Sequence, residues 1–223
     1  MKRVRIASIA IAAGLLAAAC EDPAQMQPYT VVPVSPFLGQ PVLGDPNAPV
    51  ELKEYASTTC SHCKAFHDEV FPKLKEAYID TGKVKMVWVV LPTAPTATSL
   101  AGAAIARCAG EPKFFDVIDA LFDAQDTLID ASSQPRKLQQ ELNAVGAKFD
   151  LTSDQVGTCI DDKGIQKATR DALADLPASI TGTPSFTIHG EKLEVESYDG
   201  LAAAIDAELA KVAGGIEPAA QPQ

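Results

Sequence analysis

Two cysteines separated by two residues are the part of this sequence best suited to chemistry. Cys60 and Cys63 stand in the run Cys-Ser-His-Cys, and two thiols at this spacing at the start of a helix lie close enough to form a disulfide. There Cys60 would face unpaired backbone N–H groups and the positive end of the helix dipole, which stabilise a thiolate. His62 would add a hydrogen-bond donor or a positive charge beside that sulfur. Because a stabilised thiolate both attacks disulfides and leaves readily from a mixed disulfide, the motif predicts thiol–disulfide exchange.

Zinc binding and an inert structural disulfide are the alternatives for this pair of cysteines. Zinc would need two further soft ligands, and the candidates are His67 with one of Cys108, Cys159 or His189. The sequence holds no second Cys-x-x-Cys and no His-x-x-x-His, so we assign no metal and no bound cofactor. We expect His67 to be an exposed or half-buried helix residue and His189 to be a turn residue.

A carboxylate six residues before the motif could serve the same chemistry. The segment from Val50 to Tyr55 alternates in polarity, which predicts a strand with Val50, Leu52 and Glu54 on one face. Glu54 would then point into the domain beneath the cysteines and could accept and return the proton of Cys63. The alternative is a carboxylate at the strand edge that reaches water.

The dipeptide Thr183-Pro184 comes just before an expected hairpin. A proline held cis there could face the disulfide and leave neighbouring backbone groups free to pair with an extended substrate. The alternative is a proline that only begins a strand.

The expected elements around these residues follow the order β-α-β, a helical block, then β-β-α. A helix from Ser61 to Asp80, kinked at Pro72, links the first strand to a second at Val84 to Leu91, which predicts a parallel pair. Between Thr96 and Leu176 the pattern predicts only helices. The remaining expected elements are four helices (Ser99 to Cys108, Lys113 to Ala124, Arg136 to Val145 and Ser153 to Ala174), hairpin strands at Ser185 to Ile188 and Leu193 to Val195, and a helix from Asp199 or Gly200 to Val212.

The first residues have the composition of an export signal. Basic residues precede an apolar run that ends in three alanines before Cys20, which fits either a bacterial lipoprotein signal or an ordinary Ala-x-Ala cleavage site. We favour lipidation of Cys20, because an odd fifth cysteine in an oxidising compartment needs an explanation. Residues 1–19 are thus a predicted signal peptide and the proline-rich residues 20–37 a tether, although Tyr29 to Val34 could instead form an edge strand. Residues 213–223 are a predicted disordered tail.

Composition limits the function classes. The 223 residues are 47% hydrophobic and 22% charged, enough for a real core and unlike disordered, collagen-like or coiled-coil chains. The formal net charge of −10 disfavours a nucleic-acid partner. In an exported protein, Cys108 and Cys159 are expected to form a structural disulfide rather than remain free thiols.

These residues together resemble the DsbA-like thiol-disulfide oxidoreductases. The resemblance covers roughly Leu38 to Val212 and rests on Cys-Ser-His-Cys after a strand, Gly-Thr-Pro-Ser-Phe before a hairpin, Glu54 at the acidic position, and the helical insert. The segments around Cys108 and Cys159 are similar to the branch with a second disulfide. It implies an α/β thioredoxin-like fold with an inserted all-helical domain: residues 38–95 and 177–212 form the thioredoxin-like domain and 96–176 the insert.

The resemblance also implies roles and partners. Cys60 would be the exposed nucleophile, Cys63 the buried resolving sulfur, His62 a group that stabilises the reduced form, and Thr183-Pro184 a cis-proline loop beside them. The implied protein is a monomeric periplasmic oxidase that introduces disulfides into unfolded exported proteins and is reoxidised by a quinone-linked membrane partner like DsbB. An isomerase or reductase of the same fold, and a thioredoxin-fold holdase or assembly factor, are the alternatives.

Overall fold

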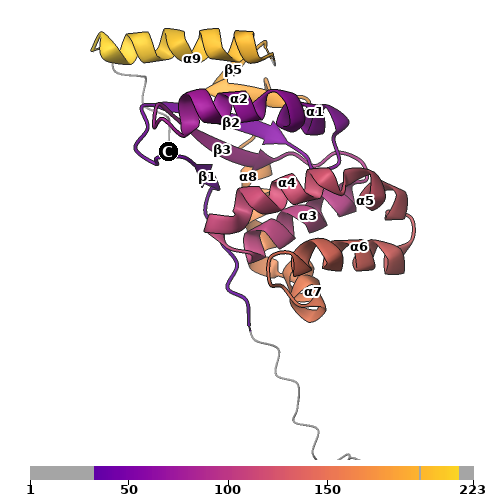
Figure 1. The fold of residues 1–223 in the computed structure, drawn as a ribbon. Coiled ribbons are helices and arrows are strands. Elements are labelled where there is room, and N and C mark those ends of the chain that lie inside the picture. Colours follow the sequence, from indigo (N-terminus) through magenta and orange to yellow (C-terminus); the bar gives the residue numbers. More distant parts are fainter. Residues whose placement is uncertain (1–32, 196, 216–223) are drawn as a thin grey trace, which may run out of the picture. The chain divides into compact units, whose positions relative to one another are not determined.

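The structure is a computed structural model that describes residues 33–195 and 197–215. Its sheet has five strands in the order β1-β3-β2-β4-β5 (Figure 1); β2 and β3 are parallel and all other neighbours are antiparallel. In chain order the elements are β1 (Val42–Leu43), β2 (Val50–Ala56), α1 (Ser61–Glu69), α2 (Phe71–Leu74), the π-helical turn η2 (Lys75–Ile79), β3 (Val84–Val90), α3 (Thr96–Cys108), the 3-10 turn η3 (Glu111–Lys113), α4 (Phe114–Asp123), α5 (Gln125–Ala131), α6 (Pro135–Ala147), α7 (Ser153–Asp161), α8 (Lys163–Ala174), β4 (Ser185–Ile188), β5 (Glu191–Leu193) and α9 (Tyr198–Ala213).

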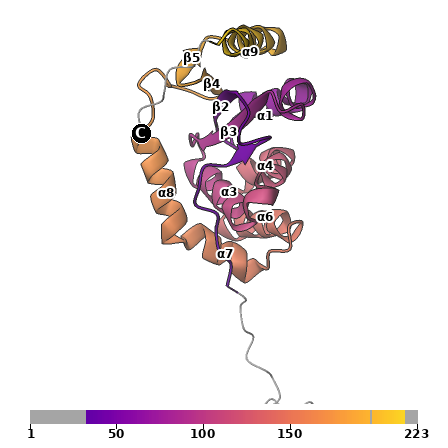
Figure 2. The same ribbon diagram turned by 90° about the vertical axis from the view of Figure 1, so that its left-hand side faces the viewer.

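Helices pack against both faces of the sheet. Alternation along β2 buries Leu52 with Met86 of β3 and Phe186 of β4 in one cluster, which α1, α2 and α9 cover. On the opposite face Tyr55 and Val87 join a smaller cluster, against which Ala172 of α8 packs. Figures 1 and 2 show α9 at one end of this arrangement and α3 to α7 gathered at the other. The predicted parallel pairing of β2 with β3 is confirmed.

The helix that follows β2 is broken rather than continuous. The predicted helix from Ser61 to Asp80 ends at Glu69, and a second begins one residue after Val70. Pro72 causes the break, since it sits in the first turn of α2, where its missing N–H costs no hydrogen bond. Gly82, with a φ of 72°, then turns the chain back into β3.

Residues 96–176 contain six helices, a 3-10 turn and no strand. The prediction of one helix from Ser153 to Ala174 is wrong. Asp162 interrupts it with an extended backbone, and its side chain accepts a hydrogen bond from the Ile165 N–H to cap α8. The short helix α5 was not predicted. By its contacts the described chain from Pro33 onward forms one unit, so the division into two domains stays a prediction.

The hairpin of β4 and β5 turns at His189 and Gly190, with φ values of 48° and 86°. Two successive positive φ values are typical of the two-residue turns whose backbone twist matches the twist of the paired strands. The second strand, expected at Leu193 to Val195, is Glu191–Leu193.

Several sequence predictions concern residues outside the described ones: the signal peptide at 1–19, Cys20, the tether up to residue 32, and the tail from residue 216. Within the described part, Pro33 and Val34 lie in no strand, and Arg107 donates from Nη1 to the carbonyls of Phe37 and Gly39, each at 3.0 Å. Strand β1 was not predicted. None of the helices in residues 33–195 and 197–215 has both the length and the apolar content to cross a bilayer.

Candidate active site

Cys60 is the N-cap of α1. Its extended backbone (φ −89°, ψ 120°) ends the loop after β2, and its Sγ accepts a hydrogen bond from the backbone N–H of Cys63 at 3.3 Å. Cys60 is partly exposed, whereas Cys63 is fully buried one turn into the helix. Both are free thiols. One sulfur is therefore open to an incoming thiol and the other is shielded.

The two thiols have opposite proton affinities. The hydrogen bond from Cys63 lowers the pKa of Cys60 to about 5, against the effect of burial and with help from Thr183 and from the backbone N–H groups of Cys63 and His62. The pKa of Cys63 is raised, first by its hydrogen bond to Cys60, then by burial and by the negative charge of Glu54. At neutral pH the pair therefore holds one thiolate, on Cys60, and one proton, on Cys63.

The Thr183-Pro184 peptide bond is cis and adjoins the reactive sulfur. In its protonated form, Cys60 donates from Sγ to the carbonyl oxygen of Thr183, 3.3 Å away. His62 is exposed, between the two cysteines on the first turn of α1. The structure thus brings Cys60, Cys63, His62 and the Thr183-Pro184 loop to one place.

Glu54 is buried with no exposed surface, so the alternative of a carboxylate in water at the strand edge is wrong. Its Oε2 lies 3.1 Å from Nε2 of His67, and its Oε1 has no hydrogen-bond partner. The expectation that His67 is exposed or half-buried is also wrong, because 7% of its surface is accessible. Rings of α2, β3 and α4 enclose it, so its burial depends on neighbours that no local pattern reveals.

Two further groups at the site were not found from the sequence. Gln125 of α5 is buried, and its Nε2 donates to the carbonyls of Thr58 and Cys60 at 2.9 and 3.0 Å. Ser57 Oγ bonds to the hydroxyls of Ser99 and Thr93 at 2.8 and 3.0 Å. These contacts fix the loop that carries Cys60. In the sequence, the polar run Ser-Thr-Thr in this loop was the only local indication of these contacts.

The remaining candidate ligands do not gather at this site. Cys108 of α3 and Cys159 of α7 are joined in a disulfide, with Cα atoms 6.1 Å apart. His189 lies in the hairpin turn, 3.8 Å from a carboxylate oxygen of Glu208. Among the described residues no group of three or more His, Cys, Asp or Glu side chains could hold a metal ion.

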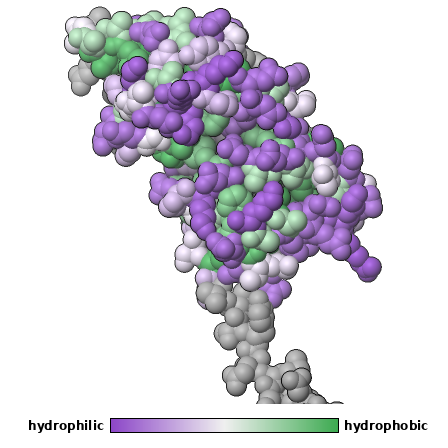
Figure 3. Space-filling view, viewed as in Figure 1, coloured by the Kyte–Doolittle hydropathy of each residue, from purple (hydrophilic) through white to green (hydrophobic). Residues whose placement is uncertain are grey.

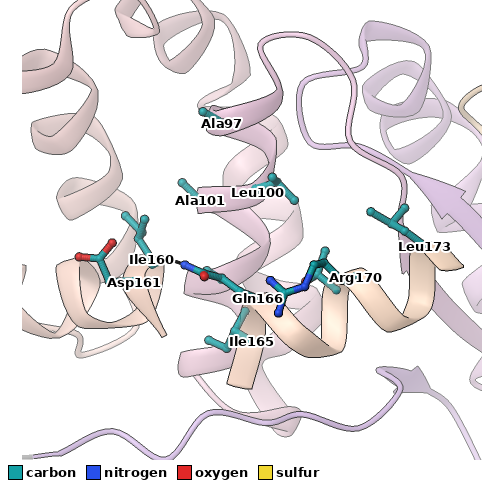
Figure 4. Close-up of a pocket in the computed structure, with 11 residues that line it drawn as sticks. Ala97, Leu100, Ala101, Ile160, Asp161, Ile165, Gln166, Arg170 and Leu173 are labelled. Carbon is teal, nitrogen blue, oxygen red and sulfur yellow. Dashed lines mark hydrogen bonds between the residues drawn. The ribbon is translucent and has the colours of Figure 1, made fainter. Parts of the chain in front are cut away.

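A pocket of about 370 Å³ opens between α3, α7 and α8 (Figure 4). Small and apolar side chains such as Ala101 and Leu100 line it, and Gln166 closes one side by donating to the carbonyl of Ile160 at 3.3 Å. It shares no residue with the cysteine site. We therefore centre the active site on the cysteine pair rather than on this pocket.

A sheet in which a strand leads into a thiol-capped helix, faced by a cis-proline loop, defines a thioredoxin fold. The sequence profile of the thioredoxin family matches residues 38–207. A Wolbachia pipientis structure, alpha-DsbA1, is 31% identical, with a TM-score of 0.69, and the match covers 82% of this chain and 96% of that one. The chain belongs to the thioredoxin family, in its DsbA-like branch, as the resemblance predicted.

Relatives among known proteins carry related names. A Rickettsia bellii protein named as a protein-disulfide oxidoreductase is 31% identical over 74% of this chain. The chain spans 62% of the length of that relative. A Bacillus anthracis protein named as disulfide bond formation protein D is 29% identical over 77% of this chain and 79% of that one.

Proposed function

We propose that this protein is a thiol-disulfide oxidoreductase that donates the Cys60–Cys63 disulfide to thiols of exported proteins. The observation that carries the proposal is the asymmetry of the pair: a partly exposed Cys60 whose pKa is lowered to about 5, capped on a helix over a buried Cys63. The names and likeness of the relatives support the same activity.

Disulfide donation would run in two exchanges. A substrate thiolate attacks Cys60 Sγ, the Cys60–Cys63 bond breaks, and its electron pair leaves with Cys63 Sγ, which takes a proton. A second substrate thiolate then attacks the substrate sulfur of the mixed disulfide, and Cys60 leaves as a thiolate. Two substrate thiols become one disulfide, while the enzyme gains two electrons and one proton, and the other proton goes to water.

The low pKa of Cys60 favours this direction. At neutral pH a thiolate of pKa about 5 is stabilised over a thiol of pKa 9.0, which stabilises the reduced enzyme by at most about 3 kcal/mol, or about 60 mV for two electrons. Solvent screening at the partly exposed sulfur reduces this figure. A more stable reduced form makes the disulfide a stronger oxidant and argues against a reductase.

A cavity beside the cis-proline could hold the substrate chain. It measures about 250 Å³ and is lined by Pro184, Ser185, Phe186 and residues of the hairpin as far as Val195. Val195 is one of the large apolar side chains exposed in the described part of the chain. The face drawn in Figure 3 is mostly polar, with scattered apolar areas. A cavity with a small apolar part next to the cis-proline would suit unfolded substrates of varied sequence.

The cellular setting follows from the sequence pattern. The export signal and Cys20 support a bacterial periplasmic protein held to a membrane by a lipid. Reduced enzyme would be reoxidised by a quinone-linked membrane partner like DsbB, and the enzyme would act as a monomer. Labelling with a radioactive fatty acid, compared between the protein and its Cys20→Ser variant, tests the anchor.

Stoichiometric oxidation of a reduced two-cysteine peptide tests the activity. Oxidised protein should convert the peptide to its disulfide, and the Cys60→Ser variant should not. His189→Gln, at the hairpin turn, should act like the parent protein. A protein that leaves the peptide reduced but shuffles wrong disulfides would be an isomerase. Chaperone activity that survives Cys60→Ser, with no oxidation by the parent, would indicate a holdase.

A further inference from the structure

Glu54 is a buried carboxylate for which the sheet supplies no countercharge. Its register partners are Trp88 on β3 and Phe186 on β4, and neither ring carries a charge. A buried carboxylate without a charged or hydrogen-bonding partner takes up a proton instead of staying ionised. Any partner that holds Glu54 ionised must therefore come from the helices.

His67 of α1 is that partner, and it is held between two carboxylates. Its Nε2 lies 3.1 Å from Glu54 Oε2, and its Nδ1 lies 3.5 Å from Oδ1 of Asp119 on α4. The second distance fits an ion pair, without the alignment of a hydrogen bond. The rings of Phe71 and Phe122 lie 4.7 and 4.6 Å from the imidazole centroid and fix its plane.

We propose that His67 is a positioning residue for the disulfide chemistry: as an imidazolium it keeps Glu54 ionised within electrostatic reach of Cys63, and Asp119 stabilises it from the helical segment. The inference rests on the proposed thiol–disulfide activity and on the predicted role of Glu54 as its base, and it adds the group that supports that base. Cys63 packs in the same buried cluster as Trp88, the register partner of Glu54 on β3, and the charge of Glu54 raises the pKa of Cys63. Two carboxylates around one imidazole also connect α4 to the proton chemistry of the cysteine pair.

The step that needs an ionised Glu54 is the attack of Cys63 on a mixed disulfide at Cys60. The proton of the Cys63 thiol passes to the Glu54 carboxylate, and the freed electron pair of Cys63 Sγ forms a bond to Cys60 Sγ. The bond between Cys60 and the partner sulfur breaks, and its electron pair leaves as a thiolate. Cys63 is oxidised and the partner sulfur is reduced, while Cys60 exchanges one disulfide bond for another and keeps its oxidation state. In the opposite direction Glu54 returns the proton to Cys63.

The surroundings of His67 favour its charged form. Burial lowers its pKa, but the hydrogen bond to Glu54 and the negative charges of Glu54 and Asp119 outweigh burial and raise it to about 9. A cavity of about 300 Å³ next to the ring brings Asp68 of α1, Lys75 of η2 and Asp123 of α4 to its edge. Acidic groups outnumber the one lysine there, so the imidazolium persists through neutral pH.

Resolution of a preformed mixed disulfide isolates this step. Full-length protein carrying glutathione on Cys60 is mixed into buffers from pH 4 to pH 10, and release of glutathione is followed by rapid quench. The variants are His67→Gln, which keeps a donor but no charge, Glu54→Gln, the double variant, and Asp119→Asn. His189→Gln removes a histidine outside the site and is the matched control.

In Glu54→Gln, loss of the base should slow the release of glutathione at pH 7 on the order of 100-fold. His67→Gln should slow it at least tenfold at pH 7 and should recover as pH rises, because the buried carboxylate loses the positive charge that lies 3.1 Å from it. His67→Gln should add nothing in the Glu54→Gln background. Asp119→Asn, at a side chain that is 56% exposed and tolerates change, should slow release about two- to fivefold.

Two results would overturn the inference: a pH profile for both His67→Gln and Asp119→Asn that overlays that of the parent, or a His67→Gln effect that multiplies with that of Glu54→Gln. Thermal melting of each variant separates unfolding from slow chemistry, and Asp119→Asn covers the case in which His67→Gln fails to fold. A parent protein that cannot form or resolve the mixed disulfide would instead refute the proposed function.

Discussion

The Sγ atom of Cys60 accepts a hydrogen bond from the backbone N–H of Cys63 at 3.3 Å, at the first turn of α1. The same residue supplies, through its thiol, the largest single contribution that lowers the pKa of Cys60 to about 5. The spacing of the two cysteines therefore places Cys63 where it stabilises the reactive thiolate of Cys60.

Titration of the reduced protein tests this directly. Thiolate absorbance at 240 nm, and alkylation of Cys60 by iodoacetamide, should rise with a midpoint near pH 5. In Cys63→Ala the midpoint should move up by about one unit or more, because the main hydrogen bond is lost. A midpoint near 9 in the parent protein would contradict the account.

The raised pKa of His67 predicts a stability that falls with pH. Its pKa is about 9 in the folded protein and 6.5 as a free side chain, so its contribution is complete below pH 6.5 and is lost as pH rises through 9. The loss is at most about 3 kcal/mol. Urea unfolding should be measured on the oxidised protein, because the lowered pKa of Cys60 adds a slope of opposite sign in the reduced form. His67→Gln should flatten the slope and His189→Gln should keep it; equal slopes in all three proteins would refute the assignment.

Gln125 is predicted to hold the loop that carries Cys60. Gln125→Leu leaves the buried carbonyl of Thr58 without its donor and the carbonyl of Cys60 with only the N–H of Lys64. This should cost about 1 to 3 kcal/mol of unfolding free energy and slow peptide oxidation. Gln139→Leu removes a surface bond to Asn143 and should stay within about 0.5 kcal/mol of the parent. Chemical denaturation measures both, and equal effects would argue against a special role for Gln125.

The Cys108–Cys159 disulfide closes a separation of 51 residues between α3 and α7. On the chain-entropy account its removal destabilises by about 4 kcal/mol. The double variant Cys108→Ala/Cys159→Ala should therefore unfold at clearly lower urea concentration than the parent. An unchanged midpoint would show that the helices are held by packing alone.

The sequence was informative wherever short-range patterns decide the structure. Alternation along β2 was enough to place Glu54 on the buried face, and the apolar run at Val84 to Leu91 was enough to predict β3 and its parallel pairing. Pro72 marked the interruption of the helix after β2 for the same reason, since the backbone limits of proline are local.

Long-range contacts explain what the sequence did not show. His67 lies beside Phe66 on an ordinary amphipathic helix, and only the packing of α4, far along the chain, buries it against Asp119. Gln125 stands in a seven-residue helix too short to show a period. The start of α8 at Asp162, in contrast, could have been predicted from the sequence, because aspartate is a common N-cap residue.

The equilibrium reduction potential of the Cys60–Cys63 pair in glutathione buffers tests the central claim most directly. A disulfide donor should have a potential above about −200 mV, since the stabilised Cys60 thiolate favours the reduced form. A potential near that of thioredoxin, about −270 mV, would contradict the oxidase and indicate a reductase.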